Sequence, residues 1–474
     1  MGKDANLRGI KFFIKTYGCQ TNVYDSEKIA LLLLELGLTE VDDENSADIV
    51  ILNTCHIREK ARHKVLSELG LLRPLKEHRL REGRPFLLVV CGCVAQAEGA
   101  ELLGEAPFVD VILGTKAFPR VGLHVAEAWK RACSGLTRQR LRLQSQTTWP
   151  VLKGAQIVDV NFQDESHPAP IPLEAKSEGA AFVAIQKGCD KFCTYCVVPY
   201  TRGAEVSRPV DSVLEEIRND AAKGILEVTL LGQNVNAYSG WGPDGQRWSF
   251  GRLLEAVHDI EGIRRIFYTS SHPLDVSLDV IKAHATKPKI MPYWHLPIQS
   301  GSDAILKAMN RKHTAAEYLK VVELIRTYNP GIAMASDFIV GFPGETEEDF
   351  ESTLELVRAV QFAQSFSFKY SQRPGTPAAD WPNQVDEDVK TRRLLVLQDL
   401  LREQQRAFNE TFIGREIPVL FRRHGKKGPQ ILGKSPYMQS VVVDVADPEL
   451  YMNSIVPVRI VSVTATCLTG VFVE

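Results

Sequence analysis

The sequence predicts an α/β protein in three parts: an amino-terminal parallel sheet with helices, a central partial barrel of six βα units, and a small carboxyl-terminal all-β barrel. Short β-like runs alternate with amphipathic stretches in the first part, six more such runs follow in the second, and five short β-like pieces end the chain. The expected domains are 8–130 for the sheet, 131–174 for a linker, 175–408 for the central barrel and 409–474 for the last barrel.

The composition is that of a folded protein from a reducing compartment. The chain has 474 residues, 44% of them hydrophobic and 24% charged, and its net charge of −2 excludes a uniformly basic nucleic-acid coat. Nine cysteines, an odd number in a long chain, argue against a disulfide scaffold and favour thiolates that bind metals or react. Neither a signal peptide nor an apolar run of about 18 residues is present, so we expect a cytoplasmic protein that does not cross a membrane.

The first part repeats a strand followed by a helix. The run IKFFIKT precedes DSEKIALLLLELG, where Asp25 or Ser26 is expected to cap the helix and Gly37 to end it. ADIVILNT then precedes a helix from about Ile57, and FLLVVCGC precedes one from about Val94. This order predicts a parallel sheet.

A cysteine follows each of these three strands. Cys19, Cys55 and Cys93 are 36 and 38 residues apart, about one βα unit each. Because the carboxyl ends of parallel strands meet at one edge of a sheet, we expect the three thiols to converge there. A disulfide with one spare thiol, or a redox switch, is the alternative. Cys91 lies inside the third strand and is expected in the core, whereas Cys133 and Cys467 have no other cysteine nearby in the sequence.

The central part begins after a stretch rich in Gln, Pro and Ser that holds one possible strand, AQIVDVNF. The six β-like runs are AAFVAIQKG, EVTLLGQN, RIFYTSS, YWHLPIQS, MASDFIVG and SFSFKYS. Polar residues and glycines stand at the end of each run. The carboxyl ends of the strands form the functional face of an α/β barrel, so we expect a pocket at these ends.

A compact cysteine motif, GCDKFCTYC, follows the first barrel strand. Cys189, Cys193 and Cys196 have the spacing CxxxCxxC, and Tyr195 stands just before the last thiol. Zinc sites usually take four ligands, and this segment holds neither a fourth Cys nor a His. Three thiolates suit a four-iron cluster in which one iron keeps an open coordination position.

This motif, with its aromatic residue and its place on the first strand of a six-unit barrel, resembles the radical S-adenosylmethionine (SAM) superfamily. Matching segments extend over almost the whole chain: TYGCQTN, NTCHIREKA, CGCVAQ, GCDKFCTYCVVPYTRG, LLGQNVNAY, SSHP, LPIQSGSD and DFIVGFPGET. Together they resemble the methylthiotransferases, of the MiaB type that modifies isopentenylated adenosine beside the tRNA anticodon. Thr21 and His56 stand where Met and Ser are common in that type, and neither change removes a cysteine.

The resemblance implies two [4Fe–4S] clusters and SAM as cofactors. Cys189, Cys193 and Cys196 would hold the cluster whose open iron chelates SAM and yields a 5′-deoxyadenosyl radical. Cys19, Cys55 and Cys93 would hold an auxiliary cluster associated with the sulfur that a first SAM methylates. The radical formed from a second SAM would open carbon 2 of adenine, so we expect no catalytic residue beyond the clusters.

Further contacts are expected at the ends of the barrel strands. The candidates for binding SAM are Tyr195, Gln233, Ser271, Gln299 and Asp337. The segment GFPGET lacks the Lys of a phosphate-binding loop, so we expect it to shape the turn after the fifth strand or to contact SAM. An electron donor such as flavodoxin is an expected partner, and we expect a monomer.

The carboxyl-terminal part resembles the TRAM domain of RNA-modifying enzymes, an OB-like barrel. Six Lys or Arg residues stand against one acidic residue between Arg415 and Lys434, and the expected RNA-binding residues are Arg422, Arg423, Lys426 and Lys427. Two more basic segments, 58–84 and 116–142, show that the net charge averages over an uneven distribution. Phosphate contacts would position the tRNA anticodon loop while the reacting base is unstacked into the barrel mouth.

Three classes of function remain open from the sequence. The first is methylthiolation of N6-isopentenyladenosine at position 37 of tRNA. The second is the same chemistry on threonylcarbamoyl adenosine or on a ribosomal-protein side chain. The third is an iron–sulfur protein that binds RNA or transfers electrons without SAM chemistry. The six-strand pocket disfavours the third class, and the segments NTCHIREKA and QNVNAY with the basic turn disfavour a protein substrate.

Overall fold

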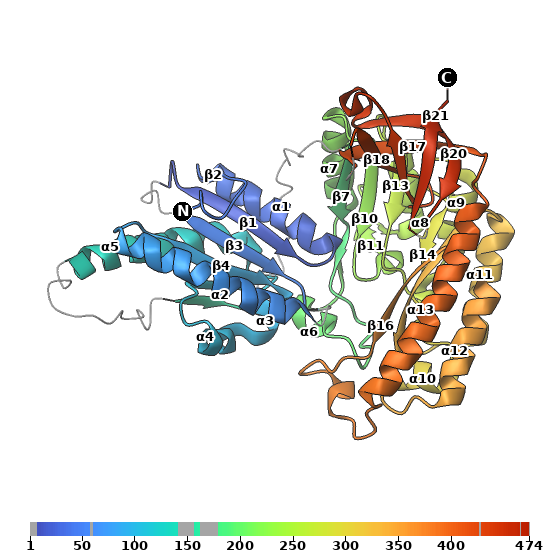
Figure 1. Cartoon of the computed structure of the whole chain (residues 1–474), viewed down its shortest axis with the longest axis horizontal. Helices are drawn as coiled ribbons and strands as arrows, with labels where there is room; N and C mark the ends of the chain where they lie inside the picture. The colour runs from blue at the N-terminus through green and yellow to red at the C-terminus, as the bar shows by residue number, and fades with distance from the viewer. Residues whose placement is uncertain are drawn as a thin grey trace. The chain divides into compact units, whose positions relative to one another are not determined.

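The computed structural model describes residues 7–56, 60–140, 156–161, 179–425, 428–464 and 466–473. The chain forms two compact units (Figure 1). Unit 1 consists of residues 1–173 and 197–203, and unit 2 consists of residues 174–196 and 204–474. None of the helices in these described ranges is long and apolar enough to cross a membrane.

Unit 1 contains a six-stranded parallel sheet with the order β2-β1-β3-β4-β5-β6. Alternate residues of its central strands enter two separate apolar clusters, one with Ile49 and Ile51 and the other with Val50 and Leu52. The sheet is therefore covered on both faces, which explains its continuous apolar runs. The strands are β1 (Lys11–Tyr17), β2 (Thr39–Glu40), β3 (Ile49–Thr54), β4 (Leu87–Gly92), β5 (Val111–Leu113) and β6 (Ile157–Asp159).

The covering helices of unit 1 follow the strands in the expected alternation. They are α1 (Gln20–Glu35), α2 (Lys60–Arg81), α3 (Cys93–Glu98), α4 (Leu102–Glu105) and α5 (Val121–Arg140), with short 3₁₀ turns η1 (Gly99–Glu101) and η2 (Phe118–Arg120). The short helix α6 (Val198–Arg202) comes from the separate segment 197–203 and contacts α3. Helix α5 continues to Arg140, and the possible strand in the linker is β6, the edge strand of the sheet.

The expected cap of the first helix is wrong. Helix α1 begins at Gln20 with Cys19 in the N-cap position, so Asp25 and Ser26 lie inside the helix and are buried. Asp25 pairs with Arg202, and Ser26 accepts a hydrogen bond from Asn53. These tertiary partners satisfy side chains that, by local preference alone, favour a helix end. Gly37, with φ +85°, follows the helix as expected.

The six expected barrel runs of unit 2 are all strands. They form two three-stranded parallel sheets, β13-β10-β7 and β14-β15-β16, joined through a bridge between Ile266 and Ile290. In this order β7 and β16 are edge strands, so the barrel is partial, as expected. The strands are β7 (Ala180–Ala184), β10 (Glu227–Leu231), β13 (Arg265–Tyr268), β14 (Tyr293–His295), β15 (Ala333–Val340) and β16 (Gln364–Lys369).

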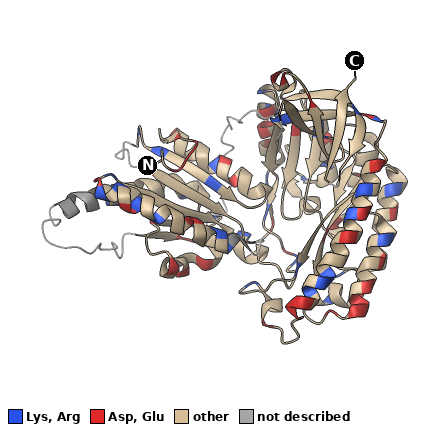
Figure 2. Ribbon diagram, viewed as in Figure 1, with Lys and Arg blue, Asp and Glu red and all other residues tan. Residues whose placement is uncertain are grey.

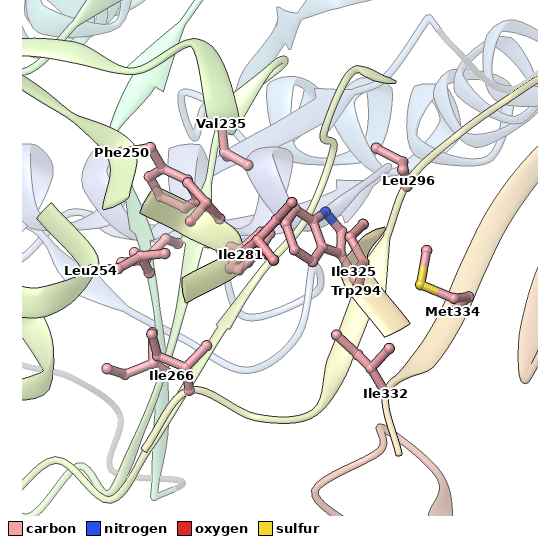
Figure 3. Packing of buried hydrophobic residues seen from close by; sticks show 14 of the residues in the cluster. Val235, Phe250, Leu254, Ile266, Ile281, Trp294, Leu296, Ile325, Ile332 and Met334 are labelled. Atoms are coloured by element: carbon pink, nitrogen blue, oxygen red, sulfur yellow. The ribbon is translucent and has the colours of Figure 1, made fainter. Parts of the chain in front are cut away.

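Helices cover the outer face of these strands. Trp294 of β14 is fully buried among residues such as Ile281 and Ile325, which come from two of the covering helices (Figure 3). The helices are α7 (Val210–Ala222), α8 (Phe250–His258), α9 (Leu278–Thr286), α10 (Asp303–Ala308), α11 (Ala315–Tyr328) and α12 (Glu347–Val360). Acidic and basic residues alternate along α11 (Figure 2), where Glu317, Lys320 and Glu323 are exposed, so this side of the helix faces solvent.

Smaller elements lie between the βα units. Two hairpins are formed by β8 (Gln186–Lys187) with β9 (Val206–Ser207) and by β11 (Ser239–Trp241) with β12 (Arg247–Ser249). Three 3₁₀ turns, η3 (Val235–Ala237), η4 (Pro273–Asp275) and η5 (Pro377–Asp380), follow strand ends.

The long helix α13 (Glu387–Glu410) leads from the central barrel to the last domain. Its N-cap is Asp386, whose side chain accepts a hydrogen bond from the Asp388 backbone N–H. The last domain is a closed barrel with the order β17-β18-β19-β21-β20, as expected. Its elements are β17 (Glu416–His424), β18 (Gln430–Lys434), β19 (Ser440–Asp444), η6 (Pro448–Tyr451), β20 (Ser454–Val463) and β21 (Cys467–Phe472).

The last domain closes the amino-terminal end of the central barrel. An apolar cluster there contains residues from the beginnings of β14 and β15, including Tyr293 and Ala333, and it packs against Phe408 of α13 and against Tyr437 and Met438 of the β18–β19 turn. The cluster forms a floor beneath the barrel interior. The opposite end, where the strands finish, is the mouth.

A buried charged group fastens the last domain beside this floor. Glu227, at the start of β10, lies 3.6 Å from the Arg265 guanidinium and 3.7 Å from that of Arg422. Arg265 also donates to the carbonyl oxygens of Lys434 at 2.8 Å and Pro418 at 2.6 Å. Burial raises the pKa of Glu227 and lowers that of Arg265, so desolvation acts against both charges. Removing one member would leave the others uncompensated.

The substitution Glu227→Gln should lower the free energy of unfolding by about 3 kcal/mol, because Arg265 then keeps a buried charge without its carboxylate. Urea denaturation followed by circular dichroism measures the loss. The matched control is Glu416→Gln, which removes an exposed pair with Arg459 and should cost less than about 1 kcal/mol. Equal effects of the two variants would contradict the anchoring role of Glu227.

Candidate functional site

Three cysteines of unit 1 stand at the ends of three adjacent strands. Cys19 follows β1, Cys55 directly follows β3, and Cys93 begins α3 after β4. A hydrogen bond with Cys55, aided by the nearby charge of Arg202, lowers the pKa of the Cys19 thiol to about 5 despite its burial. Cys91 is buried on the strand itself, within the apolar cluster of one sheet face, as expected of a core residue.

Two glycines allow the ends of β1 and β4 to approach the end of β3 closely. A Cβ atom on Gly18 would lie 2.7 Å from the Cβ atom of Cys55, and one on Gly92 would lie 2.4 Å from the Thr54 carbonyl oxygen. Gly92 also has φ +96°, which favours glycine. Larger residues at these two positions would force the thiol-bearing segments apart.

A buried ion pair lies beside these thiols. Arg202 of α6 and Asp25 of α1 are 2.8 Å apart, and their side chains are 5% and 3% exposed. Burial alone lowers the pKa of Arg202, but the neighbouring Cys93, Asp25 and Cys19 outweigh burial and raise it. The Arg202 cation can therefore balance negative charge on the thiolates. The sequence reasoning assigned Arg202 no role, because its tertiary partners lie far away along the chain.

The second cysteine triad lies in unit 2, on the loop after β7 and β8. Gly188, with φ +78°, donates its backbone N–H to the Gln233 side chain at 2.7 Å. The middle of the loop rests on the turn after α10, because the Thr194 backbone donates to Met309 at 3.1 Å and the Asn310 amide donates to Phe192 at 2.9 Å. This turn fixes the path of the loop.

A buried arginine also contacts this triad. Arg311 donates to the Cys193 sulfur at 3.7 Å and to the Pro297 carbonyl oxygen at 2.5 Å, and it is 5% exposed. Burial lowers its pKa, but the charges of Tyr195 and Cys193 outweigh burial and raise it. Sequence reasoning also missed Asn310 and Arg311. The segment MNRKHT that carries them showed no cysteine or repeated pattern.

Both triads offer the kind of ligand that iron–sulfur clusters use. Within the described residues, no three His, Cys, Asp or Glu side chains converge closely enough to hold one metal ion. In an iron–sulfur cluster each thiolate binds a different iron, so the thiols stand apart around it. Each triad offers three thiols and one buried arginine, which suits an anionic cluster with one iron left open.

Three of the residues expected to bind SAM have partners within the protein. Gln233 accepts from the triad loop, Ser271 accepts from the Trp294 indole at 3.3 Å, and the Tyr195 ring meets Phe342 edge-on. Gln233 and Tyr195 therefore also shape the triad site. Their roles toward SAM stay predictions.

Gln299 lies four residues past the end of β14, whereas Asp337 lies within β15, three residues before its end. Gln299 has φ +79° and Ser270, at the end of the third strand, has φ +67°, so two non-glycine residues hold strained backbones at the barrel mouth. Such strain is common at binding sites. The Asp337 carboxylate lies within hydrogen-bond distance of His295 Nε2, at 3.1 Å. Binding of SAM by Gln299 and Asp337 also stays a prediction.

The segment GFPGET forms a tightly bonded turn. Glu345 accepts from the Gly341 backbone N–H at 2.6 Å and pairs with Arg393 of α13 at 2.8 Å. Burial raises the pKa of Glu345 to about 7. These bonds support the expected role of this segment in shaping the turn.

The expected RNA-binding residues differ in their surroundings. Arg423 is exposed, whereas Arg422 is partly buried and pairs with Glu227. Lys426 and Lys427 lie outside the described residues. In the basic segment 58–84, Arg73 and Lys76 pair with acidic residues.

Two family models match the chain. Residues 11–114 match "Uncharacterized protein family UPF0004", and residues 183–357 match the "Radical SAM superfamily". The first match covers strands β1 to β5 with Cys19, Cys55 and Cys93, and the second covers Cys189, Cys193 and Cys196.

Two curated relatives are similar over nearly the whole length. A protein of Maricaulis maris (strain MCS10) is 51% identical over 97% of this chain and 96% of its own. One of Agrobacterium fabrum (strain C58 / ATCC 33970) is 48% identical over 98% of this chain and 97% of its own. Both are named tRNA-2-methylthio-N(6)-dimethylallyladenosine synthase.

Solved structures share the fold at low identity. The radical S-adenosylmethionine methyltransferase TsrM from Kitasatospora setae matches with a TM-score of 0.52 and 14% identity, over 78% of this chain and 75% of that one. The cobalamin-dependent S-adenosylmethionine radical enzyme OxsB matches with a TM-score of 0.50 and 12% identity, over 83% of this chain and 56% of that one.

The two triads should load iron independently. After anaerobic reconstitution the protein should contain about eight irons per chain, and Cys93→Ala and Cys193→Ala should each contain about four, because each variant loses a ligand of one cluster. Iron and acid-labile sulfide assays measure this. Cys133→Ala, which changes an exposed thiol on α5, is the control and should keep about eight. About four irons in the unmodified protein would rule out the second cluster.

Proposed function

The chain belongs to the tRNA-2-methylthio-N6-dimethylallyladenosine synthase family of radical SAM methylthiotransferases, and from this membership we propose that it adds a methylthio group to carbon 2 of N6-isopentenyladenosine at position 37 of tRNA. The observation that carries the proposal is the full-length match to synthases of that name, together with two separate cysteine triads on one chain. Transfer of sulfur to a C–H carbon requires both a sulfur donor and an activated carbon, so two sites are needed.

The cofactors are SAM and two [4Fe–4S] clusters, as in the enzymes of this family. We assign the SAM-chelating cluster to Cys189, Cys193 and Cys196 and the auxiliary cluster to the three thiols of unit 1. When bound, these groups supply SAM cleavage at one site and the sulfur at the other. The protein's own part is to bind, orient and shield them.

The described residues support this part in two ways. Arg202 and Arg311 place one buried cation at each triad, which offsets the charge of an anionic cluster in surroundings of low polarity. The floor of the central barrel is closed by the apolar contacts of Tyr293, Phe408 and Tyr437, so water and substrate can enter the interior from the mouth. A radical formed there is shielded from below.

We also propose the remaining partners and setting. The tRNA anticodon loop would be held by phosphate contacts on the last domain, an electron donor such as flavodoxin would reduce the SAM-chelating cluster, and the enzyme would act as a monomer in the cytoplasm. Arg423, exposed at the end of β17, and the basic run that it begins support the RNA contact.

Nucleoside analysis tests the reaction. With isopentenylated tRNA, SAM and a reductant, the protein should produce 2-methylthio-N6-isopentenyladenosine, detected by mass after digestion. Cys193→Ala should form no 5′-deoxyadenosine, whereas Cys93→Ala should still cleave SAM but give no methylthio product. Methylthiolation of threonylcarbamoyl adenosine or of a ribosomal protein instead would refute the proposed substrate.

The salt dependence of tRNA binding tests the role of the last domain. Arg423→Ala should weaken binding uniformly across tRNA sequences and lower the slope of log K against log [salt] by about one, as the loss of one phosphate contact does. Adding Arg422→Ala should weaken binding further, although this residue also pairs with Glu227. Arg406→Ala on α13 is the exposed control. If the double variant keeps the affinity and the salt slope of the unmodified protein, these two residues do not contact the tRNA.

A further inference from the structure

Two phenylalanines of the last barrel strand are unusually exposed. Phe366 and Phe368 of β16 each have 48% of their surface exposed, and they alternate with Ser365 and Ser367. Aromatic side chains in the strands of a folded domain normally supply its buried core. Two half-exposed rings on one side of one strand therefore form a surface available to a ligand.

Strand register places both rings inside the barrel. Phe366 lies opposite Asp337 of β15, and Phe368 lies opposite Ile339. The residue between them on β15, Phe338, points the other way and is fully buried in the helix-facing core. Because paired residues of neighbouring strands share a face, the two phenylalanines and Asp337 face the barrel interior.

Phe366 and Phe368 have polar neighbours, His295 and Asp337, and lie next to the apolar floor. The His295 ring contacts Phe366 edge-on, with 6.5 Å between ring centroids, and also bonds to Asp337. Toward the floor, Tyr293 donates to Gln364, the residue that begins β16. β16 is an edge strand of its sheet and packs against α13 (Figure 1). The pair thus forms an aromatic wall between the apolar floor and the mouth, next to one carboxylate.

We propose that Phe366 and Phe368 are specificity-determining residues that receive the adenine ring and its isopentenyl group. This inference rests on the proposed function, since it names the part of the barrel that reads the modified base. Aromatic rings bind a base by stacking, and an apolar wall suits the uncharged five-carbon substituent.

The neighbouring carboxylate of Asp337 disfavours substrates with an anionic N6 substituent. A threonylcarbamoyl group at the same adenine nitrogen carries a negative charge, which the nearby carboxylate of Asp337 would repel. His295 holds this carboxylate beside Phe366. The wall therefore accepts an apolar N6 substituent and disfavours an anionic one.

Binding of anticodon stem-loops to the reconstituted full-length protein tests the inference without relying on turnover. Three fluorescent RNAs of identical sequence would be compared by anisotropy, carrying adenosine, isopentenyladenosine or threonylcarbamoyl adenosine at position 37. The unmodified protein should prefer the isopentenylated loop over the adenosine loop by about tenfold or more. Phe366→Ala with Phe368→Ala should abolish this preference and should also weaken binding of the adenosine loop about tenfold, because stacking on the adenine ring is lost.

Matched variants separate recognition from folding. Phe366→Tyr keeps the ring and should keep the preference, and Tyr328→Ala removes an exposed aromatic side chain from α11 and should change nothing. Asp337→Asn should reduce the difference in binding affinity between the loop with isopentenyladenosine and the loop with threonylcarbamoyl adenosine. An iron content equal to that of the unmodified protein would show that each variant is folded and carries its iron–sulfur clusters.

Different results would overturn the two proposals. If the unmodified protein makes the methylthio product but the double phenylalanine variant keeps its full preference, the wall is not the recognition surface and the proposed function stands. If the unmodified protein makes no methylthio product with isopentenylated tRNA, the proposed function itself fails. If Asp337→Asn leaves the difference in affinity between these two loops unchanged, the Asp337 carboxylate plays no part in distinguishing them.

Discussion

The convergence of parallel strand ends shapes both candidate metal sites: it gathers the three thiols of unit 1, and in unit 2 it places Gln233, just after β10, against the loop that carries the second triad. A thiol placed just after a strand reaches the same edge as the thiol after the neighbouring strand, so residues such as Cys19 and Cys55 meet although a whole βα unit separates them. Convergence is limited by backbone sterics, because Gly92 approaches Thr54 too closely for any side chain. The glycines at the strand ends are therefore as much a part of the site as the sulfur atoms.

Thiols that lie close together also require a nearby positive charge. Ionised thiolates in a poorly hydrated site repel one another, and their charge is tolerated only beside a cation or a metal. Both triads meet this requirement with an arginine delivered by a different segment: Arg202 on a short helix held in unit 1, and Arg311 on a turn after α10. A buried arginine stays charged at any physiological pH, so the compensation does not depend on pH.

The order of elements and the cysteine groups could be predicted from sequence because they depend on local periodicity and on motif spacing. The partners of those groups could not. Asp25 has the local signature of a helix cap, yet its pairing with Arg202 places it inside the helix. Phe366 and Phe368 fit the alternation of a half-buried strand, but only register with Asp337 shows that the rings face an open interior. Tertiary pairing decides such cases, and periodicity carries no information about it.

With the RNA contacts proposed here, the floor and the mouth of the central barrel would have separate roles in recognising the RNA. Arg422 pairs with Glu227 where β10 begins, so the basic turn after β17 starts near the floor. Strand β15 has 8 residues, which at the usual rise per residue separates floor from mouth by about 25 Å. Cations at one end cannot touch a base that enters at the other. The proposed phosphate contacts on the last domain would therefore set only the position of the RNA, and the proposed discrimination among N6 substituents would come from side chains inside the barrel.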